Sequence, residues 1–316
     1  MKKICLFLIL PIIFLNSFCK NSKKNEILVL HAGSLSIPFK EIAKNFMKKH
    51  PDVKVVLEAH GSRTCARQIT DLKRRVDIMA SADTQVIKNF LIPEYADFSI
   101  DFTTNEMTIM YNEKSKHSDE INSKNWYKIL LRPDVQYGHS DPNADPCGYR
   151  TILTWKLSEK YYKIPGLFKK LDGEMPKKNI RPKEVDLIAM LEAYELDYIF
   201  IYQSVACQHK AKYVMLPDEI NLKSPDLSDL YRSVSLKISG KKPGEFIEKR
   251  GAPMVYGITL LRDASNPYLG AKFIEFLLDK EGQKIMRENG QPEIIYPNVD
   301  NYNKLPEILK KYFKKR

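Results

Sequence analysis

Small residues and hydroxyl groups stand at two places where an apolar run of the sequence gives way to an amphipathic one. Gly33 and Ser34 follow the first run, and Gly61 and Ser62 follow the second. Backbone N–H groups at the start of a helix lack partners and carry the positive end of the helix dipole, so an anion binds well there. Each corner taken alone is explained as well by helix capping and turn formation.

Two more corners of the same kind carry carboxylates. Asp145, Pro146 and Cys147 precede the amphipathic segment 148–162, and Glu184 falls in the first turn of another predicted helix. Four corners of the same polar and small character indicate one shared anion site. Carboxylates are unusual there, because like charges at short range repel each other and raise a pKa. Glu184 alone is also explained as an acid favoured by the helix dipole.

The elements that would position these corners alternate between strand and helix patterns. Strands are predicted at residues 27–30, 53–59, 76–82, 107–111, 135–140, 196–202 and 253–261. Helices are predicted at residues 62–75, 148–162 and 183–195, with a pair of helices at 266–289. This alternation predicts an α/β fold with mostly parallel sheets and helices on both faces. In such sheets ligands bind beyond the carboxyl ends of the strands, which is where the corners lie.

The composition narrows the classes of function. A chain of 316 residues with 43% hydrophobic and 28% charged residues fits a soluble protein of two lobes. Lys and Arg total 51 against 39 Asp and Glu, and the resulting net charge of +12 is dispersed along the chain. No nucleic-acid reader motif accompanies this charge, so we predict no nucleic-acid partner. A basic surface also attracts small anions and anionic lipid.

A secreted α/β hydrolase is the alternative from a different class. The sequence contains neither G-x-S-x-G nor H-E-x-x-H. His31 and His60 sit beside two of the corners, where they serve either as acid–base groups or as supporting residues. Cys65, Cys147 and Cys207 form no C-x-x-C pair, so buried thiols are expected and a zinc cluster is not.

The N-terminus is predicted to direct the chain out of the cytoplasm. Two lysines precede an apolar run at 4–14, which is typical of a signal peptide and short for a membrane span. Cys19 stands between this region and a Lys-rich tether at 20–26, an arrangement similar to a lipoprotein processing site. We therefore predict a signal peptide at 1–19 and a lipid anchor at Cys19, with ordinary cleavage nearby as the alternative.

Over most of its length the sequence resembles the archaeal-type tungstate/molybdate-binding proteins of ABC importers, which are relatives of the bacterial molybdate-binding proteins. The segments that carry the resemblance are LHAGSL, GSRTCARQITDLKRRVDIMASAD, DPNADPCGYRT, RPKEVDLIAMLEAYELDYIFIYQSVACQH and APMVYGITLLRDASNPYLGAKFIEFLLDKEGQKIM. The resemblance implies a two-lobed periplasmic-binding-protein fold (type II) with the ligand in the cleft. It implies a first lobe of residues 27–105 and 216–316 and a second lobe of residues 106–215, with crossings near 101–111 and 215–222.

Carried over residue by residue, the resemblance implies an oxyanion site built from all four corners and one later strand. Its members are Ser34, Ser62, Asp145, Pro146, Cys147, Glu184 and Tyr202. Molybdenum and tungsten accept more than four oxygens, so the resemblance implies that Asp145 and Glu184 bind the metal of the oxyanion and build a six-coordinate centre. Such a centre would reject sulfate and phosphate by chemistry as well as by size.

The resemblance also implies what the protein does. It would be an extracytoplasmic binding protein, not an enzyme, that captures tungstate or molybdate and delivers it to the permease of an ABC importer. It would need no cofactor besides this ligand and would act as a monomer. The residues themselves leave open another oxyanion, such as sulfate or phosphate, a ferric complex, or the hydrolase described above.

Overall fold

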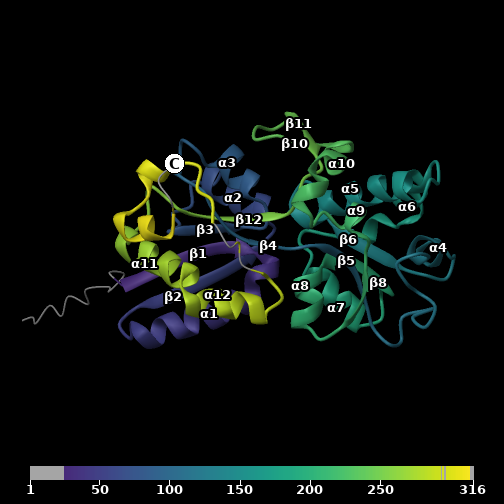
Figure 1. Ribbon diagram of the computed structural model, residues 1–316, viewed down its shortest axis with the longest axis horizontal. Coiled ribbons are helices and arrows are strands. Elements are labelled where there is room, and N and C mark those ends of the chain that lie inside the picture. The colour runs from purple at the N-terminus through teal and green to yellow at the C-terminus, as the bar shows by residue number, and fades with distance from the viewer. Residues whose placement is uncertain (1–24, 293, 295–296, 314–316) are drawn as a thin grey trace, which may run out of the picture.

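The structure is a computed structural model that describes residues 25–292, 294 and 297–313. Two sheets lie side by side, each covered by helices (Figure 1). The predicted α/β fold of two lobes is confirmed. No helix in the described part of the chain is long and apolar enough to cross a membrane. The predicted signal peptide at 1–19 and the tether as far as residue 24 lie outside the described residues.

The first sheet has the strand order β2-β1-β3-β12-β4. Its strands are β1 (Glu26–Ala32), β2 (Lys54–His60), β3 (Ile78–Ser81), β4 (Ile100–Thr104) and β12 (Val255–Leu260). Strand β1 pairs in parallel with β2 and β3, whereas β12 runs antiparallel to β3 and β4. The helices of this lobe are α1 (Ser36–Lys49), α2 (Ser62–Thr70), α3 (Thr84–Phe90), α11 (Pro267–Leu278) and α12 (Lys280–Glu288).

Alternation along β1 explains why helices cover both faces of this sheet. Ile27 and Val29 belong to the core that also contains α1 and α11, whereas Leu30 belongs to the core under α2 and α3. Successive side chains of a strand point to opposite faces, so an apolar run of this kind must be buried on both sides. Strand β1 is therefore central, and its carboxyl end is held firmly where Ser34 follows.

The second sheet has the strand order β7-β6-β8-β5-β9. Its strands are β5 (Met107–Tyr111), β6 (Tyr137–Ser140), β7 (Ile180–Arg181), β8 (Tyr198–Tyr202) and β9 (Lys212–Met215). Its helices are α4 (Trp126–Leu130), α5 (Pro146–Tyr161), α6 (Leu167–Glu174), α7 (Asp186–Glu192), α8 (Gln203–Gln208) and α9 (Asp218–Asn221). Strand β6 pairs in parallel with β7 and β8, but β5 runs antiparallel to β8 and β9. In each sheet one strand, β12 in the first and β5 in the second, runs against the others, so the strands are mostly parallel as predicted. Each reversed strand is the one that follows a crossing between the lobes.

The chain passes from the first sheet to the second between β4 and β5, where Asn105 lies. The return follows α10 (Ser228–Arg232) and the hairpin of β10 (Ser235–Ser239) and β11 (Phe246–Arg250). Thr154 of α5 donates to the carbonyl of Ile220 at 3.0 Å, and Lys156 donates to the carbonyl of Ser235 at 2.5 Å. These contacts favour a return crossing after β11, later than the predicted one near 215–222. The division into lobes remains a prediction.

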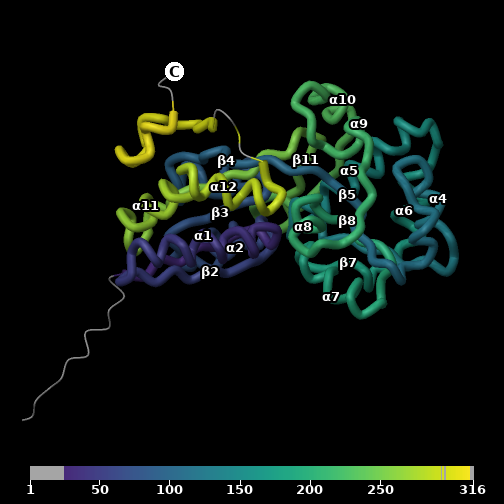
Figure 2. Tube along the Cα trace, turned by 60° about the horizontal axis from the view of Figure 1, so that its bottom comes forward, coloured from purple at the N-terminus to yellow at the C-terminus, as the bar shows by residue number. Residues whose placement is uncertain are grey.

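Short 3-10 helices complete the described chain. They are η2 (Gly33–Leu35), η3 (Lys177–Asn179), η4 (Pro225–Leu227), η5 (Tyr302–Lys304) and η6 (Glu307–Tyr312). The last of these packs against α11 with Leu309 buried, and Figure 2 shows this C-terminal segment beside α11 at the far side of the first lobe.

Two helices are shorter in the structure than the sequence predicts. The helix predicted at 62–75 ends at Thr70, because Lys73 adopts a left-handed conformation with φ of 52° that a right-handed helix cannot continue. Helix α7 begins at Asp186, so Glu184 lies two residues before the helix and not in its first turn. Glu184 is therefore not a first-turn acid of α7, which was the structural alternative for this residue.

Candidate functional site

The four corners meet where the two lobes touch. A Cβ atom built on Gly33 would lie 3.1 Å from Oε1 of Glu184, and one built on Gly61 would lie 2.5 Å from the carbonyl oxygen of Ala144 and 3.0 Å from that of Pro182. Real Cβ atoms do not approach backbone oxygens at 2.5 Å, so glycine is required at position 61 for the lobes to come this close. Corners that are more than eighty residues apart in the sequence therefore face each other in space.

Two serines from the first lobe bring hydroxyls to this contact. Ser34 lies in η2 directly after β1, and its Oγ is 3.0 Å from the hydroxyl of Tyr256. Ser62 is the first residue of α2, and its Oγ accepts a hydrogen bond from the backbone N–H of Ala82 at 3.0 Å. Both serine side chains are fully buried. Each serine is therefore held by the protein on one side and keeps further hydrogen-bonding capacity on the other.

Asp145 organises the second-lobe side of the contact. It is the N-cap of α5, and its Oδ1 accepts from the backbone N–H of Cys147 at 3.4 Å. Its Oδ2 accepts from the backbone N–H of Glu184 at 3.1 Å, which ties the turn before α7 to the start of α5. Burial raises the pKa of Asp145 above its ordinary value.

Glu184 is buried without a partner. Neither of its carboxylate oxygens has a hydrogen bond among the described residues, and its side chain is 1% exposed. Burial and then the charge of Asp145 raise the pKa of Glu184 well above its ordinary value. A buried carboxylate without a donor or cation is costly, so this pair calls for a proton or for an electron-poor centre from outside the protein.

Tyr202 reaches the same contact from the end of β8. Its hydroxyl accepts a hydrogen bond from Nη1 of Arg150 at 2.9 Å, and the same nitrogen donates to the carbonyl of Ala82 in the first lobe at 2.7 Å. Burial raises the pKa of Tyr202 well above its ordinary value, so the phenol keeps its proton and is able to donate it. Arg150 was not singled out in the sequence, although it lies in the same DPNADPCGYRT segment as Asp145.

Three of the backbone N–H groups at these corners have protein partners. The N–H groups of Arg63 and Thr64, at the start of α2, both donate to the carbonyl of Ala144, at 3.1 and 3.3 Å. The N–H of Cys147 faces Asp145, and Pro146 has no N–H to offer. These three N–H groups are therefore already used by the protein, and the side-chain hydroxyls of Ser34, Ser62 and Tyr202 are further donors at this contact.

The sulfur of Cys147 is directed away from the contact. It lies 3.7 Å from the carbonyl oxygen of Phe200, in the core of the second lobe. Cys65, Cys147 and Cys207 are all free thiols, as predicted. No group of three or more His, Cys, Asp or Glu side chains that could hold a metal ion occurs among the residues that the structure describes.

A hairpin of the second lobe also holds α2. Nη2 of Arg67 donates to Oγ of Ser239 at 2.9 Å and to the carbonyl of Gly240 at 3.0 Å, and Arg63 contacts Ser239 as well. Ser239 in turn donates from its backbone N–H to Oδ1 of Asn143 in the second lobe at 2.8 Å. Figure 1 shows the tip of the β10–β11 hairpin pointing toward α2. This hairpin latch, residues 235–250, secures the closed arrangement from outside the buried contact.

The two histidines beside the corners do not form an acid–base pair. His31 is buried, its Nδ1 lies 2.8 Å from the carbonyl oxygen of Ala32, and burial lowers its pKa to about 4. His60 is partly exposed, and burial followed by the charge of Lys183 lowers its pKa too. Both rings are therefore neutral at pH 7 and occupy supporting positions.

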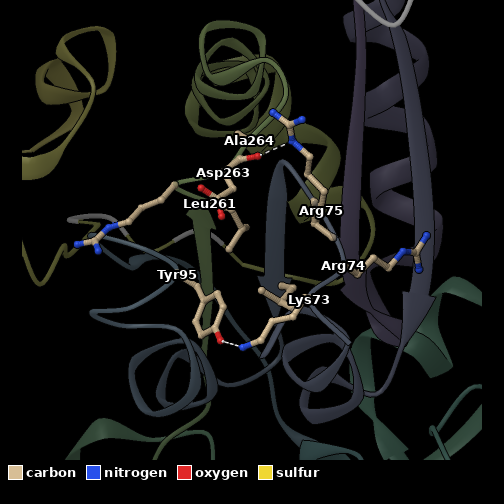
Figure 3. A pocket seen from close by; sticks show the side chains of 10 residues that line it. Lys73, Arg74, Arg75, Tyr95, Leu261, Asp263 and Ala264 are labelled. Carbon is tan, nitrogen blue, oxygen red and sulfur yellow. Dashed lines mark hydrogen bonds between the residues drawn. The ribbon is translucent and has the colours of Figure 1, made fainter. Parts of the chain in front are cut away.

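A separate basic cavity of about 530 Å³ lies in the first lobe, at the end of α2 far from Ser62. Its lining residues are Ile69, Lys73, Arg74, Arg75, Val76, Tyr95, Leu261, Arg262, Asp263 and Ala264. The cationic contacts are those of Lys73 with the Tyr95 hydroxyl, Arg74 with the Glu58 carboxylate, Arg75 with the Asp263 carbonyl and Arg262 with the Asp97 carboxylate. Figure 3 shows Arg74 turned away from the centre of the cavity, whereas Lys73 faces Tyr95. None of the predicted site residues lines this cavity.

Comparison with known proteins identifies relatives along the whole described core. Residues 27–291 match the family described as bacterial extracellular solute-binding protein. A solute-binding protein of Petrotoga mobilis is 55% identical over 289 residues, covering 92% of this chain and 90% of the relative. The molybdate/tungstate-binding protein WtpA of Pyrococcus abyssi is 42% identical over 315 residues, covering 91% of this chain and 90% of the relative.

Solved structures share the fold at low sequence identity. The periplasmic molybdate-binding protein of Azotobacter vinelandii has a TM-score of 0.63 at 14% identity, over 84% of this chain and 98% of that protein. The sulfate-binding protein SubI of Mycobacterium tuberculosis has a TM-score of 0.61 at 10% identity, over 86% of this chain and 88% of that protein. The fold alone therefore does not separate one oxyanion from another, and the choice must come from the side chains.

Proposed function

This chain belongs to the family of bacterial extracellular solute-binding proteins, and we propose that its solute is molybdate or tungstate. It is a binding protein and not an enzyme, and the family places its work outside the cytoplasm. The observation that carries the choice of solute is the buried pair of Asp145 and Glu184, placed opposite the hydroxyls of Ser34 and Ser62.

The two halves of this contact fit two parts of the same ligand. The hydroxyls of Ser34, Ser62 and Tyr202 would donate hydrogen bonds to the oxygens of a tetrahedral dianion. The carboxylates of Asp145 and Glu184 would then supply oxygens to the metal, and a six-coordinate metal would give them the electron-poor partner that the protein lacks. Sulfur in sulfate and phosphorus in phosphate do not expand in this way, so for them two carboxylates would only repel.

Relatives of known ligand support this proposal, because WtpA of Pyrococcus abyssi shares 42% of its residues with this chain over nearly the whole length of both. The bound oxyanion would be handed to the permease of an ABC importer by a monomeric binding protein. No cofactor besides the ligand is proposed.

A lipid anchor at Cys19 would keep the protein at the membrane surface, near that permease. This residue lies outside the described part of the chain, so the proposal rests on the sequence pattern. Cys19→Ala should move the protein from the membrane fraction to the soluble fraction, and retention of the variant with membranes would contradict the anchor.

Isothermal titration with molybdate, tungstate, sulfate and phosphate tests the proposed solute. We expect saturable binding of molybdate and tungstate, with no competition from sulfate or phosphate at equal concentration. Sulfate or phosphate binding as tight as that of molybdate would show that Asp145 and Glu184 do not act as metal ligands.

A further inference from the structure

A hydroxyl group has a single proton, so its direction decides whether the group can donate to an anion. Molybdate and tungstate offer only acceptor oxygens at neutral pH. A serine whose proton already points to a protein acceptor would therefore face such a ligand with lone pairs and would repel it. The hydrogen bonds behind each hydroxyl of the site consequently decide whether that hydroxyl is useful.

Asn105, at the first crossing between the lobes, has an amide whose orientation is fixed. Its Oδ1 accepts from the backbone N–H groups of Glu106 at 3.0 Å and of Ser204 at 3.4 Å. Its Nδ2, which can only donate, is directed to Oγ of Ser204 at 2.7 Å and to the hydroxyl of Tyr256 at 3.0 Å. The reversed amide would place an NH₂ group against two N–H donors, so only this orientation satisfies the buried side chain.

The orientation of Asn105 sets the direction of the protons on two successive hydroxyls, those of Tyr256 and Ser34. The Tyr256 hydroxyl accepts from Asn105, so its own proton is directed to Oγ of Ser34 at 3.0 Å. Ser34 accepts that proton, which leaves its own proton free to point into the site. Asn105, Ser34 and Tyr256 are at most 4% exposed, so water does not compete with this order.

The other two hydroxyls of the site follow the same rule through different donors. Ser62 accepts from the backbone N–H of Ala82, and Tyr202 accepts from the guanidinium of Arg150, a group that can only donate. Each hydroxyl therefore has a donor-only group of the protein behind it. The donor behind Ser62 is a backbone N–H, and the donor behind Tyr202 is the side chain of Arg150, in direct contact. The donor behind Ser34 is the side chain of Asn105, two hydrogen bonds away.

We propose that Asn105 is a positioning residue that, through Tyr256, makes Ser34 a hydrogen-bond donor to the bound oxyanion. This inference rests on the proposed function, because it assigns Ser34 a role toward the ligand proposed above. It adds a residue at the interlobe crossing, which itself does not touch that ligand, to those that set the affinity.

A reversal of the chain tests the inference. Asn105→Asp replaces the donor by an acceptor of the same shape, so Tyr256 would turn its proton to position 105 and draw the proton of Ser34 toward itself. We expect molybdate and tungstate affinity to fall roughly 10- to 100-fold, as for the loss of one hydrogen bond to a charged group. Tyr256→Phe alone removes the hydroxyl that orients Ser34 but adds no acceptor that draws the Ser34 proton away, so it should weaken binding less than Asn105→Asp does.

The double variant distinguishes a reversal of hydrogen-bond direction from a general structural defect. Adding Tyr256→Phe to Asn105→Asp should restore roughly tenfold of the lost affinity, because Ser34 recovers its proton. The added charge is the same with and without the Tyr256 hydroxyl, so the double-mutant cycle cancels it. Affinity that is unchanged or weaker when Tyr256→Phe is added would overturn the inference, since a structural role for either residue predicts only further loss.

A neutron crystal structure of the wild-type protein without ligand gives an answer that requires no variant to fold. We expect a deuteron on the Tyr256 hydroxyl directed at Ser34, and a deuteron directed at Asn105 would overturn the inference. Failure of the wild-type protein to bind molybdate or tungstate in titration would instead overturn the proposed function. The two failures are therefore seen in different experiments.

Discussion

The basic cavity of the first lobe and the buried contact between the lobes use charge in opposite ways. The cavity is lined by Lys73, Arg74, Arg75 and Arg262, yet each of these side chains contacts an oxygen of the protein. The buried contact presents neutral hydroxyls from both lobes and two carboxylates, of which that of Glu184 has no hydrogen-bond partner among the described residues. The cationic side chains that line the cavity are therefore already bound to oxygens of the protein.

The difference shows what selects an anion here. An exposed cation attracts any anion weakly and is screened by salt, so it adds little selectivity. Oriented hydroxyls in a dry contact are costly to leave unpaired, which makes them selective for a ligand that satisfies all of them. Net charge of the chain is thus a poor guide to the place where an oxyanion is bound.

The largest effect is expected from Glu184→Gln. The neutral amide is a poor metal ligand, and loss of groups that merely support metal ligands already costs 10- to 100-fold in affinity, so we expect at least about 100-fold weaker tungstate binding by titration. Glu192→Gln, the same change at the exposed end of α7, is the matched control and should bind as the wild type does. Tighter binding by Glu184→Gln would mean that this carboxylate only repels the ligand.

Ser62→Ala should have the next largest effect. It removes one donor to a charged ligand, so we expect a loss of roughly 1.5–3 kcal/mol in binding free energy. It also leaves the N–H of Ala82 without its acceptor, so the melting temperature should fall slightly. Wild-type affinity for tungstate in Ser62→Ala would remove this corner from the proposed site.

Glu184 should lower the stability of the ligand-free protein as pH rises. The pKa of Glu184 is raised in the folded state, so between its ordinary value near 4.3 and this raised value the folded protein holds a proton on Glu184 that the unfolded chain has lost, and the contribution of Glu184 to the free energy of unfolding falls with increasing pH. Glu184→Gln should weaken this dependence and raise the free energy of unfolding at neutral pH, because the amide has no charge to bury. Denaturant unfolding at several pH values measures both effects. A steeper loss of stability in the variant would contradict the buried carboxylate.

The smallest effect is expected in the basic cavity. Arg75→Ala removes an exposed guanidinium that donates to the backbone carbonyl of Asp263, so tungstate affinity should change by less than about twofold at physiological salt, where exposed charges are screened beyond roughly 8 Å. Titration of this variant beside Ser62→Ala makes the comparison direct. A loss in Arg75→Ala as large as that in Ser62→Ala would mean that the cavity contributes to oxyanion binding.

The sequence predicted the corners well because their signals are local. A strand that ends in Gly-Ser before an apolar helical pattern is visible within ten residues, and Ser34, Ser62 and Asp145 all lie where this pattern placed them relative to strand or helix. Tyr202 ends the strand predicted at residues 196–202, but only the family resemblance singled it out as a site residue. Their roles toward a ligand remain predictions.

The supporting groups could not be predicted, since they lie far away in sequence. Tyr256 is 222 residues from Ser34, and Asn105 is 151 residues from Tyr256. The use of the α2 N–H groups by Ala144 depends on how the lobes close, which no local pattern encodes. The single reversed strand of each sheet, β12 or β5, was not predicted for the same reason, because its direction is set by the crossing that precedes it.

The hairpin latch should affect the dissociation rate of the ligand more than the direct contacts that bind it. Its contacts between Arg67 and the tip at Ser239 and Gly240 do not involve the proposed ligand, yet they must break before the lobes can separate. Contacts of this kind act mainly on the dissociation rate, so Arg67→Ala should shorten the residence time of bound tungstate in stopped-flow experiments while association changes little. A permease that displaced this hairpin would speed the release of the ligand without contacting any residue of the proposed ligand site.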